Sequence, residues 1–167
     1  RLLPASSNFA SVEEKYKDNI YNTQPGAGVA VFGFNIDRQA YNHTSKTSDD
    51  QKSSTKKAIL NKNFRQAITF ALNRENYSAQ VNGKEYAKAA IRNMYTAPAF
   101  VQVNGKDFGD VVADKLQTYG DQWSGVNLAD GQNGLYSKEK AKAQFEKAKA
   151  ELQKEGVQFP IHLDVPV

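Results

Sequence analysis

The stretch NKNFRQAITFALNRENYSAQVNG, residues 61–83, contains the clearest structural pattern in the sequence. Apolar residues at helical spacing along its first half are Phe64, Ala67, Ile68, Ala71 and Leu72. Residues at this spacing share one face of an α-helix, so the pattern predicts a helix with a buried apolar stripe. Phe70 lies outside the stripe, which predicts that the helix is also covered on a second side.

Polar residues mark the ends of two consecutive helices in the same stretch. Asn63, followed three residues later by Gln66, is expected to cap the first helix in an arrangement close to a capping box. Asn73 can cap a second helix, and Gly83 can adopt the left-handed conformation that closes its end. The sequence therefore predicts two capped helices that act as buried scaffold, and it does not place a binding site on them.

Two other segments have the composition of β-strands. Residues 29–36 are rich in Val and Phe and follow a turn-forming Pro-Gly pair, and residues 161–165 alternate apolar and polar side chains. Because residues 29–36 are almost wholly apolar, this strand is expected to be covered on both faces. Residues 37–57 carry very few large apolar side chains and are expected to form a mobile polar loop.

Two more helices are expected later in the chain. Residues 109–119 have apolar side chains at helical spacing and follow a turn at Asn104-Gly105. Ser137 is expected to cap a helix over residues 138–155, which Gly156 ends. The apolar stripe of that helix is Ala141, Phe145, Ala148 and Leu152.

The order of these elements predicts an α/β fold, with α+β as the alternative, in which helices pack on a small mixed sheet. Residues 1–167 are expected to form a single domain or part of a lobe, with residues 1–28 as a poorly patterned lead-in. The chain begins at Arg1 and ends at Val167 within an apparent strand, so we expect it to be a piece of a longer protein.

Composition excludes several classes of function. The net charge of +4 comes from lysines interspersed with acids, which does not indicate nucleic-acid binding. The chain has no cysteine, so it can have neither a disulfide nor a thiolate metal site. No apolar run approaches the roughly 20 residues that a membrane-spanning helix needs.

The candidate catalytic residues have simpler explanations. His43 and His162 are the two histidines, and no acid lies at a spacing that would make a catalytic or zinc site with them. The acidic pairs, Asp49 with Asp50 and Asp107 with Asp110, fit solvated loops and helix starts. We therefore expect no catalytic residue, no metal site and no cofactor.

Several motifs, in order along the chain, resemble the extracytoplasmic peptide-binding proteins that serve ABC importers, solute-binding protein family 5. Phe34-Asn35 and FRQAITFALNRE at residues 64–75 match the family pattern of a strand ending in Phe-Asn and a helix reading VRQAIxxALDRE, with Asn73 in place of Asp. Four further stretches are similar to the oligopeptide-binding lipoproteins of streptococci and lactococci, the Ali/Ami type, and these are residues 92–95, 100–102, 106–110 and 156–163.

The resemblance implies a non-catalytic, monomeric protein that binds oligopeptides and delivers them to an ABC-type permease. It implies that the chain is an internal fragment and part of one lobe of a two-lobed, periplasmic-binding-protein-like fold. The parent protein would be anchored by a lipid on the extracellular face of the cell membrane of a Gram-positive bacterium. The alternative, from another class, is a structural or adhesive module of a bacterial surface protein.

Peptide binders hold a ligand's backbone by strand-like hydrogen bonds and accept its side chains in aromatic-lined pockets. The residues of suitable type beside the scaffold helices are Phe32, Phe34, Asn35, Met94 and Tyr95, with Trp123 as a further candidate. For Phe32 and Phe34 a core role is favoured over ligand contact, whereas both roles remain open for Met94 and Tyr95. The family's acidic anchor for the peptide's amino group would lie beyond Val167, so we expect the isolated chain to bind peptides weakly or not at all.

Overall fold

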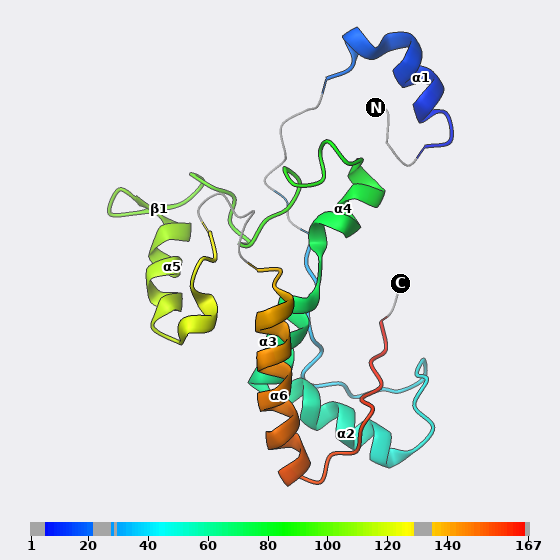
Figure 1. Cartoon of the computed structure of the whole chain (residues 1–167), viewed down its shortest axis with the longest axis vertical. Helices are drawn as coiled ribbons and strands as arrows, with labels where there is room; N and C mark the ends of the chain where they lie inside the picture. Colours follow the sequence, from blue (N-terminus) through cyan, green and yellow to red (C-terminus); the bar gives the residue numbers. More distant parts are fainter. Residues whose placement is uncertain (1–5, 22–27, 29, 129–134, 166–167) are drawn as a thin grey trace. The chain divides into compact units, whose positions relative to one another are not determined.

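The computed structural model describes residues 6–21, 28, 30–128 and 135–165. The described elements are six α-helices, two 3₁₀ helices and two short strands: α1 (Phe9–Tyr16), η1 (Lys17–Asn19), α2 (Asp49–Leu60), α3 (Lys62–Ala71), α4 (Arg74–Asn82), β1 (Gln102–Val103), β2 (Lys106–Asp107), α5 (Phe108–Gln117), η2 (Asp121–Trp123) and α6 (Lys138–Lys154). The six α-helices and β1 are labelled in Figure 1. They divide into two compact units. The first unit comprises Arg1–Val31 and Asn73–Tyr136, and the second comprises Phe32–Leu72 and Ser137–Val167.

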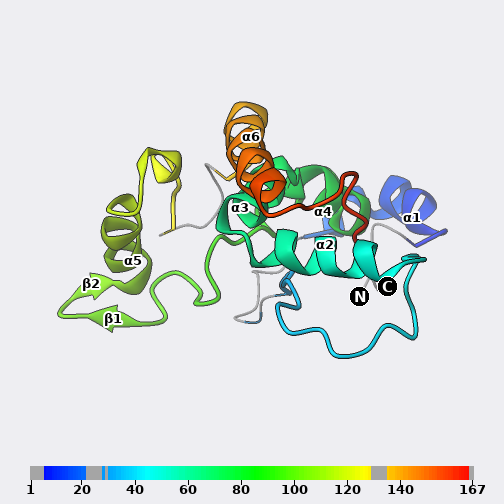
Figure 2. The same cartoon turned by 90° about the horizontal axis from the view of Figure 1, so that it is seen from below.

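The second unit is built on the packing of α3 against α6, with α2 beside both helices (Figure 2). Its core cluster consists of Ala58, Phe64, Ala148, Leu152 and Val157, and Ile68, Phe159 and Ile161 pack against it. Segments from both ends of the chain therefore supply one core, because α2 and α3 come before residue 72 and α6 comes after residue 136.

The helix predicted at the start of the opening stretch is confirmed as α3. Phe64 and Ala67 are buried, and so is Phe70, which confirms that the helix is covered on a second side. The predicted stripe is too long, because Ala71 and Leu72 at the last turn are exposed.

The predicted capping box at Asn63 and Gln66 is wrong. The cap is Asn61, whose side chain accepts a hydrogen bond from the Phe64 N–H, and the same residue closes α2. Asn63 instead donates its amide hydrogens to the Glu151 carboxylate on α6. Helix α3 begins at Lys62, two residues before Phe64, the first residue of the apolar stripe. The stripe identifies the buried face of the helix and does not identify its first turn.

The second helix of the stretch is confirmed as α4, with Asn73 as its N-cap, 3.0 Å from the Asn76 N–H. Gly83 closes the helix with a positive φ of 80°, as expected of glycine, but its ψ of 154° is extended. The predicted left-handed helical cap is therefore wrong, although a residue with a side chain would still be strained there.

The predicted strands at residues 29–36 and 161–165 are wrong for the part of the chain that the structure describes. Residues 30–35 and 161–165 have no regular secondary structure and residue 36 lies in a turn, and the sheet that is described is the antiparallel hairpin of β1 and β2. Alternating apolar residues favour a strand, but a strand also needs a neighbour to receive its backbone hydrogen bonds. The expected mixed sheet is thus replaced by a two-stranded one.

The hairpin turns at Asn104-Gly105, as the sequence predicts, and both residues have positive φ, 52° and 77°. Helix α5 follows β2 directly and packs on the hairpin. The chain is therefore a mixed fold of helices with a small sheet, consistent with a fragment of an α/β protein.

The predicted polar loop at residues 37–57 is wrong in its second half, where α2 begins at Asp49. Ser48 caps this helix through the Gln51 N–H, and Asp49 and Asp50 occupy its first turn, where carboxylates favour a helix start. Its buried face consists of Ser54, Thr55 and Ala58. A face of small and hydroxyl-bearing residues lacks the large apolar side chains by which amphipathic helices are recognised.

The long helix α6 is confirmed, with the predicted cap at Ser137, which accepts from the Lys140 N–H. Ala148 and Leu152 are fully buried, and Gly156 ends the helix region with a φ of 71°. None of the helices among the described residues has the length and apolar character needed to cross a membrane.

Candidate functional site

Three of the predicted ligand contacts lie on the segment without regular secondary structure at the start of the second unit. Phe32 is 73% exposed and Asn35 is exposed, whereas Phe34 is half-buried. The favoured core role is therefore wrong for Phe32. Asn35 makes a local turn, because its side-chain oxygen accepts the Asp37 N–H at 3.2 Å.

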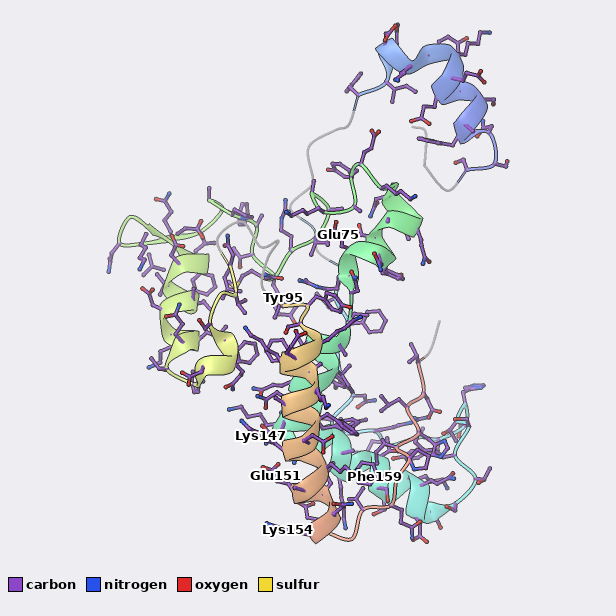
Figure 3. The ribbon with its side chains drawn as sticks, in the orientation of Figure 1. Glu75, Tyr95, Lys147, Glu151, Lys154 and Phe159 are labelled. Carbon is purple, nitrogen blue, oxygen red and sulfur yellow. The ribbon has the colours of Figure 1, made fainter. Side chains whose placement is uncertain are left out.

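The other two predicted contacts, Met94 and Tyr95, lie in the first unit. Tyr95 is 75% exposed and is labelled in Figure 3, and Met94 is half-buried. The structure places Phe32, Phe34 and Asn35 together on one segment, and Met94 and Tyr95 together on another.

A half-buried arginine holds the segment that leads to Met94 and Tyr95. Arg74, at the start of α4, donates to the Arg92 carbonyl at 2.6 Å and to the side-chain oxygen of Asn93. Asn93 in turn donates its side-chain amide to the Asn127 carbonyl at 2.7 Å. Burial lowers the pKa of Arg74, whose guanidinium nevertheless stays charged. Three stretches of the first unit are thereby held together by one guanidinium and one amide.

Sequence reasoning missed a polar cluster around Asp164, which we call the Asp164 cluster. Its members are Arg38, Thr44, Ser45, Lys46 and Asp164. One carboxylate oxygen accepts from Arg38 at 2.5 Å, Lys46 at 2.7 Å and Thr44 at 2.7 Å. The other accepts from both the N–H and the hydroxyl of Ser45, each at 3.1 Å.

The charges of the Asp164 cluster favour the ionised carboxyl. Donation from Lys46 first, and then from Thr44, Ser45 and Arg38, holds the pKa of Asp164 well below its usual range. The Lys46 side chain is fully buried, which is rare for lysine unless its charge is paired. Asp164 lies more than 115 residues from each of its partners, so no local motif could have indicated the cluster.

The second unit also has an apolar depression of about 490 Å³ that none of the predicted site residues lines. Its lining is Phe64, Phe145, Lys149, Phe159, Pro160 and Ile161. Phe145 and Phe159 meet edge to face at 6.5 Å between ring centroids. Of these lining residues, Phe159 is labelled in Figure 3. The sequence analysis named Phe64 and Phe145 as members of apolar stripes, but it did not predict that they line a common depression.

The hydrogen bonds described for the two histidines are made by their backbone carbonyls. His43 is exposed in the segment before α2, and its carbonyl accepts from Arg38. The His162 carbonyl accepts the Thr55 hydroxyl at 3.0 Å. Within residues 6–21, 28, 30–128 and 135–165, no group of His, Cys, Asp and Glu side chains could hold a metal ion. Asp107 has the predicted helix-start role, since it caps α5 through the Gly109 N–H.

Along all of its residues the chain is homologous to a segment of the streptococcal oligopeptide-binding proteins, which confirms the resemblance seen in the sequence. It is 62% identical over 167 residues to the oligopeptide-binding protein AmiA of Streptococcus pneumoniae serotype 4. It is 59% identical over the same length to SarA of Streptococcus gordonii strain Challis and to AliA of S. pneumoniae serotype 4.

These alignments include the whole of this chain but only part of each relative. The chain spans about 25% of the length of AmiA, SarA and AliA. No protein-family model matches the chain.

Proposed function

We propose that these 167 residues are an internal portion of a protein that captures extracellular oligopeptides without catalysis and delivers them to an ABC-type permease. The observation that carries this proposal is the 59–62% identity, over the entire chain, to three proteins named for oligopeptide binding. Identity at this level over 167 residues is strong support for a common fold of the matching segment. The proposed parent is a monomeric protein with two lobes that close on the peptide, anchored by a lipid on the outer face of the membrane.

The proposed ligand contacts are Phe32, Phe34, Asn35, Met94 and Tyr95. Two aromatic rings among them, those of Phe32 and Tyr95, are largely exposed, which leaves them free to pack against the side chains of a peptide. Asn35 offers amide donors beyond the turn that its oxygen makes, and such groups can bind a peptide backbone. Met94 adds a deformable side chain suited to varied partners.

The test is co-purification of peptides with the full-length protein, followed by mass spectrometry of what the protein releases on denaturation. The proposal expects a mixture of oligopeptides, and it expects the double variant Phe32→Ala, Tyr95→Ala to release less. A matched control is Tyr119→Ala, because Tyr119 is 59% exposed and is not among the proposed contacts.

The outcomes separate the function from the site. Absence of bound peptide from the unaltered protein, both as purified and after incubation with a peptide pool, would contradict peptide capture and would favour a structural or adhesive surface module. Equal peptide release by the unaltered protein and the double variant would leave the function standing and would contradict these contacts.

A further inference from the structure

The Asp164 carboxylate fastens a chain segment that is otherwise free of regular structure. Its partners Arg38, Thr44, Ser45 and Lys46 all come from the stretch that precedes α2, where no helix or strand is described. Five hydrogen bonds from side chains and backbone converge on its two oxygens at 2.5–3.1 Å. Charge-assisted bonds of this kind are about twice as strong as neutral ones, so the carboxylate is a strong point of attachment.

The C-terminal segment that carries Asp164 makes separate contacts with α2 and with the core. The Thr55 hydroxyl donates to the His162 carbonyl at 3.0 Å, and the Ser54 hydroxyl accepts the Gln158 N–H at 3.2 Å. Val157 is buried in the core, and Phe159 and Ile161 pack against that core. The backbone before Asp164 is therefore held by α2 and the core, and these contacts do not involve Arg38.

Arg38 is the partner of Asp164 that lies nearest in the sequence to the proposed ligand contacts Phe32, Phe34 and Asn35. Its guanidinium donates to Asp164, to the Ala40 carbonyl at 2.8 Å and to the His43 carbonyl at 3.2 Å, and it lies 4.3 Å from the centroid of the Tyr41 ring. A planar guanidinium with partners in several directions has little freedom to move.

The residues between Arg38 and the proposed contacts form a tight local turn. Asn35 accepts the Asp37 N–H, and the Asp37 carboxylate accepts the Gln39 amide at 2.7 Å. Residues 30–36 themselves make no ladder hydrogen bonds, and Phe32 is largely exposed. The described hydrogen bonds nearest in the sequence to Phe32 and Phe34 are therefore those of the turn at residues 35–39. Arg38 lies in this turn and connects it to Asp164.

We propose that Asp164 is a positioning residue for the peptide site, which fixes the segment carrying Phe32, Phe34 and Asn35 through its bonds to Arg38. The ligand part of this inference rests on the proposed function, and the anchoring part does not. A merely structural role for Asp164 would stabilise the second unit against unfolding and would leave the mobility of residues 32–36 in the folded state unchanged.

The first experiment measures that mobility in the 167-residue chain. The sequence has no cysteine, so Ile36→Cys, at a position that is 56% exposed, provides one site for a nitroxide spin label. Adding Asp164→Asn is expected to shift the electron paramagnetic resonance spectrum toward its mobile component at a temperature where circular dichroism shows the helices intact. The matched control is Asp49→Asn, which removes an exposed carboxylate paired with Lys52 in the same unit and should leave the spectrum unchanged.

An unchanged spectrum in folded Asp164→Asn would overturn the inference. If Asp164→Asn prevents folding, the same spectrum is measured in Arg38→Gln. This variant keeps the bonds from Thr44, Ser45 and Lys46 to Asp164 and loses the bond from Arg38. A mobile label in Arg38→Gln supports the inference, and an immobile label overturns it.

The second experiment uses the full-length protein and a pool of hexapeptides, with affinity measured by calorimetry. Asp164→Asn is expected to weaken binding roughly tenfold, a loss equal to about 1.4 kcal/mol, with Asp49→Asn unchanged. Equal affinity of Asp164→Asn and the unaltered protein would overturn the positioning role. Failure of the unaltered protein to bind any of the pool would overturn the proposed function, whereas the spin-label result would still decide the anchoring.

Discussion

At the scale of single residues, Asp164 should make the stability of the chain depend on acid. Its pKa is lowered in the folded state from an ordinary value of 3.8, so its stabilising effect is complete above that value and is lost progressively as the pH falls toward the folded pKa. Asp164→Asn removes the ionised carboxylate at every pH. We expect the variant to melt below the unaltered chain at pH 7, and the difference in melting temperature to shrink below about pH 4.

Differential scanning calorimetry from pH 2.5 to pH 7 measures this difference. Other carboxyls with lowered pKa, including Glu151 beside Asn61 and Asn63, titrate in both proteins and cancel in the comparison. A difference that stayed constant over the whole range would show that the charge of Asp164 does not contribute.

Gly109 lies at a position where the structure leaves no room for a side chain. A Cβ built at Gly109 would lie 2.5 Å from the Leu128 carbonyl oxygen, and this neighbour is backbone that cannot rotate away. Gly109→Ala should gain up to about 1 kcal/mol of helix propensity in α5 but lose about 1–3 kcal/mol to the clash. We expect a net loss of stability, measured by urea unfolding, in the first unit.

The control for Gly109→Ala is Gly33→Ala. No atom lies within 4 Å of a Cβ at Gly33, so that variant should change the free energy of unfolding by less than about 0.5 kcal/mol. Equal effects of the two substitutions would mean that α5 does not approach Leu128 as closely as described.

At the scale of elements, the packing of α3 against α6 supplies the core of the second unit. Substitution of Leu152 tests this packing. Leu152 is fully buried on α6, so Leu152→Ala should cost about 2–5 kcal/mol, from lost burial and the cavity left behind. Leu60→Ala at the end of α2, where the side chain is 53% exposed, makes the same chemical change and should cost less than about 1 kcal/mol. Urea denaturation followed at 222 nm distinguishes the two, and similar losses would contradict the described core.

The success of sequence reasoning at this scale follows from which interactions are local. Helices α3 and α6 were predictable because apolar residues repeat at helical spacing in each, Phe64 and Ala67 in α3 and Ala148 and Leu152 in α6. The caps of α4 and α6, Asn73 and Ser137, were predictable because each bonds to a backbone N–H three residues away. Helix α2 was missed because its buried face, Ser54, Thr55 and Ala58, carries little apolar surface. Its Ser48 cap and acidic first turn were nevertheless visible in the sequence.

The strands and the Asp164 cluster show the opposite case, in which the deciding partner is distant. Alternation at residues 161–165 favours a strand, but among the described residues no segment pairs with it. Asp164 bonds to residues 118–126 positions away, and Lys46 looks like a solvated charge until its carboxylate partner is known. Of the candidate site, the sequence could name suitable residue types, and their contact with a peptide stays a prediction.

At the scale of the whole molecule, the proposed ligand contacts are divided between the two units. Phe32, Phe34 and Asn35 belong to one unit, and Met94 and Tyr95 to the other, within a chain that spans about 25% of each named relative. A peptide site usually encloses most of its ligand, and affinity depends on that enclosure and on contacts already held in place. We therefore expect the proposed site to need surface beyond these 167 residues to enclose a peptide.

We accordingly expect the 167-residue chain to bind oligopeptides with a dissociation constant weaker than about 1 µM, which corresponds to less than about 8 kcal/mol of binding free energy. Isothermal titration of a mixed oligopeptide pool into the isolated chain measures this, and the full-length protein at the same concentration is the control. Because the helices of the chain are held by their own caps and core, circular dichroism should show that weak binding is not a consequence of unfolding. Submicromolar binding by the isolated chain would place the complete site within these residues and contradict a site shared with the rest of the parent protein.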